Sequence, residues 1–450
     1  MKRRKPRAQP TWRSLQYVAA REFMETNTHY LEAGKQTDRA RSRTRKRLRR
    51  SLTGSFFGLP VLIFLSAMGC SSSSTKSASP PPGLPPPTAP SASNAYLGIQ
   101  SPAAKWQVSL NHNTNAFSAA DLTNSSLGNI IGSFSIQSPT EFLDLAQTNV
   151  SPPFQPFGYG LEIPGRDLLL RPGSNTSALA ALVPGSCPNI NGPVTFQFVT
   201  LPDSSWAAGT DVAYGTIQVR TSGNAWNFSN FTQFMLNSSS RSATLGAGTC
   251  GANGSSNAVT IPAKPPTTAA STLAVGPSGF FVADQLLVPS QASSVAFGAV
   301  GVIRPASALD ATQVVGAIYL GFIYEPACLS GQPCGAPTQM AEFSNSTCPP
   351  GSAPPSPTAM CGGPFSEDNL GSIPAGTTVI DLGEEDKTRF GLYTSATIQI
   401  PDPNLVCSQT GFCTLPAVAV VGNPEDKFAI FLIAQDLVNN SPMVIYLFQQ

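Results

Sequence analysis

Cysteines are the residues of this chain whose type and spacing point most clearly to a chemistry. Nine occur among 450 residues, and eight of them follow Cys70. In an oxidising compartment an even number of thiols favours disulfide bonds, although eight cysteines allow 105 pairings. Turn-forming residues between neighbouring cysteines favour Cys328 with Cys334, Cys407 with Cys413, and Cys348 with Cys361, which leaves Cys187 to pair with Cys250.

Other site chemistries find less support in the residue pattern. A structural zinc site needs closely paired ligands, but the chain has no Cys-x-x-Cys, and its one histidine after Cys70 is His112. That histidine follows an asparagine in a polar turn, where we expect a solvated side chain. The Gly-x-Ser-x-Gly motif, the phosphate-binding loop and the dinucleotide fingerprint do not occur in the sequence. The sequence therefore identifies no catalytic, metal-binding or cofactor-binding residue.

Carboxylates and aromatic residues leave one alternative open, a carbohydrate-binding or carbohydrate-active protein. Glycoside hydrolysis needs two facing acids, and Glu162, Asp167 and Glu325 lie near apolar runs, although we expect them to be surface charges. Residues 381–386 contain four acids that could bind calcium, but their spacing favours a solvated turn. Several aromatic residues could form a sugar-binding platform, although at strand spacing they more often pack in a core. They are Trp106, Trp206, Trp226, Tyr214, Phe228 and Phe231.

The segment before Cys70 has the order of a secretory signal. A basic block at residues 41–50 precedes an apolar run at residues 52–68, which is shorter than the roughly 20 residues of a spanning helix. With Gly69 before the cysteine and serines after it, the segment resembles a bacterial lipoprotein signal. The resemblance implies cleavage before Cys70, lipid on that cysteine and a place in the bacterial cell envelope. It favours the outer membrane, because Ser71 is not an aspartate. An ordinary cleaved signal and an uncleaved anchor are the alternatives.

Removal of residues 1–69 changes the charge of the chain. Sixteen of the 27 Lys and Arg residues lie in the first fifty positions, which we interpret as an overlong leader or a wrongly assigned start rather than a nucleic-acid-binding arm. The remainder has eleven basic and twenty-one acidic residues, a formal charge of about −10. An acidic remainder gives no electrostatic reason to bind nucleic acid. The Ser- and Pro-rich residues 70–94 predict a semi-rigid tether that reaches about 70 Å when extended.

Short apolar runs separated by Gly, Pro, Asn and Ser predict an all-β fold for residues 95–450, an antiparallel sandwich or barrel stapled by disulfides. Period-2 alternation at residues 106–110, 194–198 and 217–219 predicts half-buried strands. The first of these segments and residues 117–122 predict a hairpin.

Other runs are apolar throughout and predict strands buried on both faces. They span residues 314–324, 417–421, 428–434 and 443–448, and the last two form a predicted C-terminal hairpin. About 355 residues leave room for two β-subdomains. The candidate junction lies near residues 264–272.

The sequence as a whole favours a lipid-anchored envelope protein with a non-enzymatic binding or structural role. The expected partner is the membrane, which the protein would contact through the lipid on Cys70. Whether a glycan or a protein is its ligand does not follow from the sequence, and no cofactor is expected.

Overall fold

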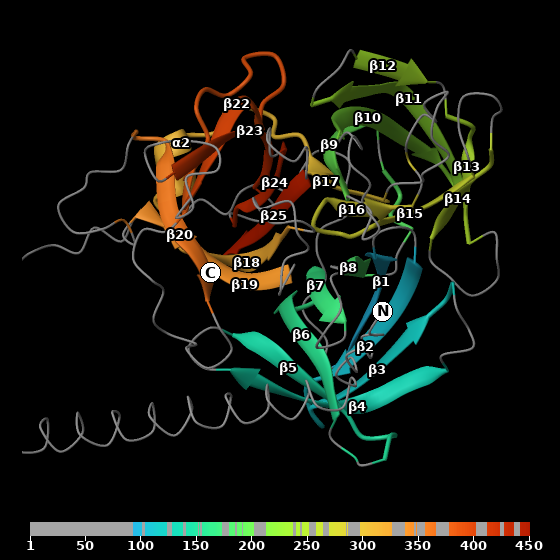
Figure 1. The fold of residues 1–450 in the computed structure, drawn as a ribbon. Helices are drawn as coiled ribbons and strands as arrows, with labels where there is room; N and C mark the ends of the chain where they lie inside the picture. Colours follow the sequence, from blue (N-terminus) through green and yellow to red (C-terminus); the bar gives the residue numbers. More distant parts are fainter. Residues whose placement is uncertain are drawn as a thin grey trace, which may run out of the picture. The chain divides into compact units, whose positions relative to one another are not determined.

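The fold is built almost entirely from antiparallel β-strands, in agreement with the all-β expectation (Figure 1). It is known from a computed structural model. All described residues fall within one compact unit of the chain. The structure describes residues 93–100, 104–123, 128–137, 141–151, 153, 155–172, 180–184, 187–190, 192–201, 213–236, 240–243, 245–251, 258–263, 270–284, 286, 298–325, 338–345, 348, 356–365, 378–401, 412–423, 427–435 and 442–450.

The strands β1 to β8 form a closed barrel, here called the first barrel, in which each strand pairs with the next and β1 pairs with β8. Its inner face carries large apolar side chains such as Val108, Leu110 and Phe117. The predicted hairpin is confirmed, since Leu110 lies opposite Phe117 in β2 and β3. The strands are β1 (Ser93–Gln100), β2 (Ala104–Asn111), β3 (Ala116–Asp121), β4 (Asn129–Gln137), β5 (Phe142–Gln147), β6 (Gln155–Ile163), β7 (Asp167–Pro172) and β8 (Ala180–Pro184).

The strands β9 to β17 form the middle sheet, whose order is β10-β9-β17-β16-β15-β14-β13-β11-β12. An additional pairing of β10 with β11 returns the sheet onto itself and encloses a core around Phe196, Phe198 and Trp226. The predicted alternation in β9 and β10 is confirmed by this core. The strands are β9 (Val194–Leu201), β10 (Ala213–Ser222), β11 (Ala225–Met235), β12 (Ser240–Ala243), β13 (Gly248–Cys250), β14 (Val259–Ile261), β15 (Ser271–Val275), β16 (Phe280–Ala283) and β17 (Gly298–Ile303).

The strands β18 to β25 close into the second barrel, with β18 paired to both β19 and β25. The predicted C-terminal hairpin is confirmed by the pairing of β24 with β25. The strands are β18 (Tyr319–Tyr324), β19 (Thr338–Ser344), β20 (Ala359–Phe365), β21 (Thr378–Asp381), β22 (Leu392–Pro401), β23 (Phe412–Gly422), β24 (Ala429–Gln435) and β25 (Pro442–Gln449).

One predicted strand is partly helical. Residues 314–324 were expected to be extended throughout, but Val314 and Val315 belong to the short helix α2 (Ala311–Val315). Asp310 caps this helix by accepting a hydrogen bond from the backbone N–H of Thr312, which favours the helical turn over a strand. Both valines are buried in the core of the second barrel, so an apolar pattern alone could not separate the two structures.

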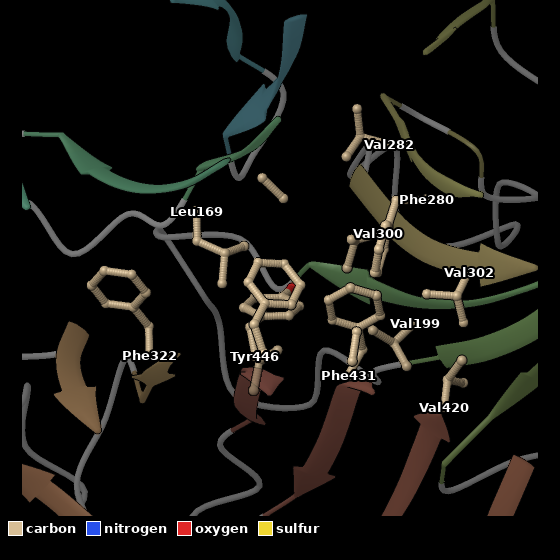
Figure 2. Close-up of a cluster of buried hydrophobic side chains, with 14 of the residues drawn as sticks. Leu169, Val199, Phe280, Val282, Val300, Val302, Phe322, Val420, Phe431 and Tyr446 are labelled. Carbon is tan, nitrogen blue, oxygen red and sulfur yellow. The ribbon is translucent and has the colours of Figure 1, made fainter. Parts of the chain in front are cut away.

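The fully apolar strands are buried on both faces, as predicted. In β24, Ile430 and Leu432 point into the second barrel, whereas Phe431 and Ile433 belong to a separate cluster, here called the shared core. The shared core joins the outer faces of both barrels to one face of the middle sheet. Figure 2 shows Phe431 beside Phe280 of the middle sheet, and the two ring centroids lie 5.7 Å apart.

The boundaries between the sheets do not fall at the candidate junction near residues 264–272. Residues 264–269 lie outside the described residues, but Ile261 of β14 pairs with Ser271 of β15, so both sides of the expected junction belong to one sheet. The sheet changes instead between β8 and β9 and between β17 and β18. The described part of the chain thus forms two closed barrels and the middle sheet. No helix among the described residues is long and apolar enough to cross a membrane.

Candidate functional site

A buried polar cluster lies at one end of the first barrel, where its apolar interior stops. Its members come from β1, from the turn between β2 and β3, and from the end of β6. The β2–β3 turn is shaped by Asn111, whose side-chain oxygen accepts hydrogen bonds from the backbone N–H groups of Asn113 and Thr114. Asn115 completes the turn with a φ of 51°, a conformation that asparagine tolerates. This local geometry brings His112 over the end of the barrel.

Glu162 is the centre of this cluster, and its side chain is only 3% exposed. One carboxylate oxygen, Oε1, accepts hydrogen bonds from Asn94 Nδ2 at 3.0 Å and from Tyr96 OH at 2.5 Å. The other, Oε2, lies 2.8 Å from His112 Nε2. Tyr96 OH also accepts a hydrogen bond from the backbone N–H of Gly165 at 3.1 Å. Both carboxylate oxygens therefore have a polar neighbour, as a buried charge requires.

The electrostatics of the cluster follow from burial. Burial raises the pKa of Tyr96 well above its ordinary value, and the adjacent Glu162 carboxylate raises it further. Tyr96 therefore remains a proton donor to Glu162 across the physiological pH range. Asn94 and Tyr96 thus hold Oε1 of Glu162 as a hydrogen-bond acceptor.

Two expectations about these residues are wrong. His112 is half-buried rather than fully solvated, because it contacts Glu162 and packs edge-on against Phe134 with ring centroids 5.3 Å apart. Glu162 is not a surface charge, because β6 directs it toward the barrel interior together with Gly160. The sequence separates Glu162 from its partners by 50 to 68 residues, so only closure of the barrel brings them together.

The three acids proposed for glycoside hydrolysis occupy different environments. Asp167 is also buried rather than at the surface, but it lies on the outer face of the first barrel, where Ser278 Oγ of the middle sheet is 3.4 Å from its Oδ2. Strand alternation separates it from Glu162, which faces the interior. Glu325 is half-buried and follows β18 in the second barrel. The structure thus gives no pair of these acids a common site.

The aromatic residues considered for a sugar-binding platform are largely core residues. Trp106 is buried in the first barrel next to Phe157, with ring centroids 6.2 Å apart, and Trp226 is buried in the middle sheet. Phe231 is buried with Trp226, whereas Tyr214 is half-buried. Phe228 packs at the edge of the same core as Trp226, and Trp206 lies outside the described residues. Burial of both described tryptophans removes them from any exposed platform.

The acidic segment at residues 381–386 is a structural turn and not simply a solvated one. Asp381 accepts hydrogen bonds from Thr358 and from the backbone of Gly383, and Glu385 accepts from the backbone of Gly391 at 2.5 Å. Asp386 pairs with Arg389 at 2.6 Å. Three of its four carboxylates are therefore engaged by the protein itself, and no group of three potential metal ligands occurs among the described residues.

A groove of about 230 Å³ lies between the middle sheet and the residues that precede β22 in the second barrel. Nothing in the sequence singles it out, because its walls come from four separate segments of the chain. Gln197 fixes one wall by donating a hydrogen bond to the backbone oxygen of Phe390 at 2.7 Å. Its lining combines apolar, hydroxyl, amide and guanidinium groups. They belong to Pro193, Val194, Thr195, Gln218, Ile303, Arg304, Pro305, Ala306, Thr388 and Phe390.

The disulfide candidates that the structure describes are bonded. Cys187 pairs with Cys250 and Cys348 with Cys361, as predicted, with Cα atoms 6.1 and 4.9 Å apart. Cys413 is disulfide-bonded as well. The candidates Cys328, Cys334 and Cys407 lie outside the described residues, as does Cys70.

Comparisons with known proteins do not assign the chain to a family. No protein-family profile matches it, and no curated protein matches it. Among solved structures, a mutant of the vaccine antigen transferrin binding protein B from Haemophilus parasuis aligns with 81% of this chain and 76% of its own, with a TM-score of 0.24 and 9% identity. A double mutant of the same antigen aligns over 82% and 78%, with a TM-score of 0.22 and 8% identity. TM-scores at this level do not establish a common fold.

Proposed function

We propose that this chain is a lipid-anchored protein of the bacterial cell envelope that acts as a non-enzymatic binding or structural module. The observation that carries the proposal is the order of residues around Cys70: a basic block, a short apolar run, a small residue, the cysteine, and a Ser- and Pro-rich tether. That order suits export followed by attachment to lipid. The outer membrane is the favoured location.

The disulfides support an extracytoplasmic location independently of the leader. Bonds such as Cys187–Cys250 and Cys348–Cys361 form and persist in oxidising compartments and are rare in the reducing cytosol. A net charge of about −10 after removal of residues 1–69 suits a protein that does not bind nucleic acid.

The way the barrels are filled limits where a partner can bind. Large side chains such as Phe117 and Leu145 occupy the interior of the first barrel, and Phe343 and Leu432 occupy that of the second. A partner would therefore bind at outer faces, barrel ends or loops, and the groove beside Phe390 is one candidate location. A carbohydrate-binding role loses support, because Trp106 and Trp226 are buried.

The proposal is tested by expressing the full chain in a bacterial host and measuring its intact mass in the membrane fraction, before and after reduction. We expect loss of residues 1–69, an added lipid mass and a mass increase on reduction that matches the disulfides. Cys70→Ala should remove the lipid mass and shift the protein out of the membrane fraction. The matched control Ser71→Ala should behave as the unaltered chain. Recovery of the full-length chain from the cytosol with free thiols would refute the proposal.

A further inference from the structure

The contact between the first barrel and the middle sheet contains a buried carboxyl group that the proposed function does not use. The turn between β15 and β16 rests on the first barrel: a Cβ added to Gly276 would lie 3.3 Å from Pro184 Cδ and 3.4 Å from the backbone oxygen of Arg166. Ser278 of the same turn places its hydroxyl 3.4 Å from Asp167 Oδ2. Asp167 thus lies directly beneath a tightly fitted joint between two sheets.

The carboxyl group of Asp167 is poorly compensated for a buried charge. Asp167 is 3% exposed, and its Oδ1 has no hydrogen-bond partner among the described residues. Burial raises the pKa of Asp167 well above its ordinary value, although Arg166 and the hydrogen bond from Ser278 act in the opposite direction. An ionised carboxylate at this position costs free energy that the neutral acid does not.

We propose that Asp167 makes the joint between the first barrel and the middle sheet sensitive to pH: the neutral carboxyl group keeps the β15–β16 turn seated on the barrel, and its ionisation loosens that contact. The sign follows from linkage. A carboxyl group that holds its proton more tightly when the joint is closed stabilises the closed joint fully below the ordinary aspartate pKa of about 3.9. This stabilisation is lost as the pH rises through the higher pKa of the closed state.

Other charged groups near the joint must be separated from this effect. Tyr96 lies behind Asp167 on the inner side of the barrel wall, with Glu162 and His112 beyond it. Farther along the same joint, Lys105 Nζ of the first barrel lies 2.9 Å from Asp284 Oδ2 of the middle sheet. Backbone and side-chain groups also hold Asp284, because Thr272 N–H and Ser271 donate hydrogen bonds to it. His112 contacts Glu162 in this neighbouring cluster, so it needs its own control.

The experiment is hydrogen–deuterium exchange of the full chain between pH 5 and 8, corrected for the intrinsic exchange rate at each pH. The reporters are peptides that cover β15–β16 and the β6–β7 turn, because Gly276 N–H bonds Phe280 O and Arg166 N–H bonds Ile163 O in the closed joint. We expect protection of these peptides to fall as the pH rises, by at most tenfold per pH unit. Asp167→Asn should abolish the dependence, and His112→Gln should retain it.

A second variant keeps the proposal testable if Asp167→Asn fails to fold. Ser278→Ala leaves the carboxyl group in place and removes its hydroxyl neighbour. It should match the unaltered chain at pH 5 and lose protection more steeply toward pH 8. Protection that does not change with pH in the unaltered chain would overturn the proposal, as would a dependence that survives in Asp167→Asn or disappears in His112→Gln.

Discussion

Three buried tyrosines offer a matched test of how the polar cluster contributes to stability. Tyr96 is 1% exposed and donates its hydroxyl hydrogen to the Glu162 carboxylate at 2.5 Å. Tyr319 is fully buried and donates to a neutral acceptor, the backbone oxygen of Val314, at 2.6 Å. Tyr446 is also fully buried, but its hydroxyl group has no hydrogen-bond partner among the described residues. Replacement by phenylalanine removes the same atom from three environments.

The magnitudes follow from the partners. Loss of a hydrogen bond to a charged group costs about 1.5–3 kcal/mol, and loss of a neutral one costs about 0.5–1.5 kcal/mol. Tyr96 also accepts a hydrogen bond from the backbone N–H of Gly165. Gly165 is half-buried, so water can replace this hydrogen bond at little cost in free energy. We therefore expect Tyr96→Phe to cost about 2 kcal/mol and Tyr319→Phe about 1 kcal/mol. Removing the unpartnered hydroxyl in Tyr446→Phe should be neutral or stabilising.

The assay is urea unfolding followed by circular dichroism, with stability differences taken from the midpoints when the slopes agree. The prediction concerns the order of the three losses in free energy of unfolding as much as their magnitudes. If Tyr96→Phe lowers the free energy of unfolding by no more than Tyr446→Phe does, the hydrogen bond from Tyr96 to Glu162 does not stabilise the first barrel. The reasoning from the hydrogen bonds of this cluster would then fail.

Two further predictions concern acid and reduction. Partial burial tends to raise the pKa of Asp386, but hydrogen bonds from Thr388 and the ion pair with Arg389 outweigh it and lower the pKa to about 2. Its stabilising contribution should be present above the ordinary pKa and disappear as the pH falls from about 4 to about 2. Thermal melts across that range should therefore decline less in Asp386→Asn, and an identical decline would contradict this assignment. The disulfides Cys187–Cys250 and Cys348–Cys361 join residues 63 and 13 positions apart. In the chain-entropy model they should contribute about 4 and 3 kcal/mol to the free energy of unfolding. The double serine variant of Cys187–Cys250 should thus unfold at lower urea than that of Cys348–Cys361, and the reverse order would count against the model.

Local pattern predicted the strands well because each strand has to satisfy burial on its own faces. The alternation at Trp106, Val108 and Leu110 reflects one face toward a core and one toward solvent. The unbroken apolar run of β24 reflects two cores, one inside the second barrel and one shared with the middle sheet. The helix α2 escaped prediction because its two buried valines fit either structure, and only the cap at Asp310 decides between them.

The polar cluster could not be predicted in the same way. Glu162 and His112 are 50 residues apart, and neither lies in a motif that marks a site. In an isolated strand or turn both side chains would be solvated, which is why surface positions were expected. They meet because β2 and β6 belong to one closed barrel. The buried carboxylate of Glu162 then needs polar partners, and only residues at that end of the barrel can reach it.

The amino-acid sequence by itself determined the local properties of this protein: where strands and turns fall, which face of each strand is apolar, and which cysteines stand at a suitable separation to bond. The tertiary structure alone decided how the sheets close, where one sheet ends and the next begins, and which acids are buried. The physical reason is the distance along the chain over which each interaction acts. Strand propensity and burial pattern act over a few residues, whereas barrel closure and the pairing of buried charges depend on contacts between segments that the chain order keeps far apart.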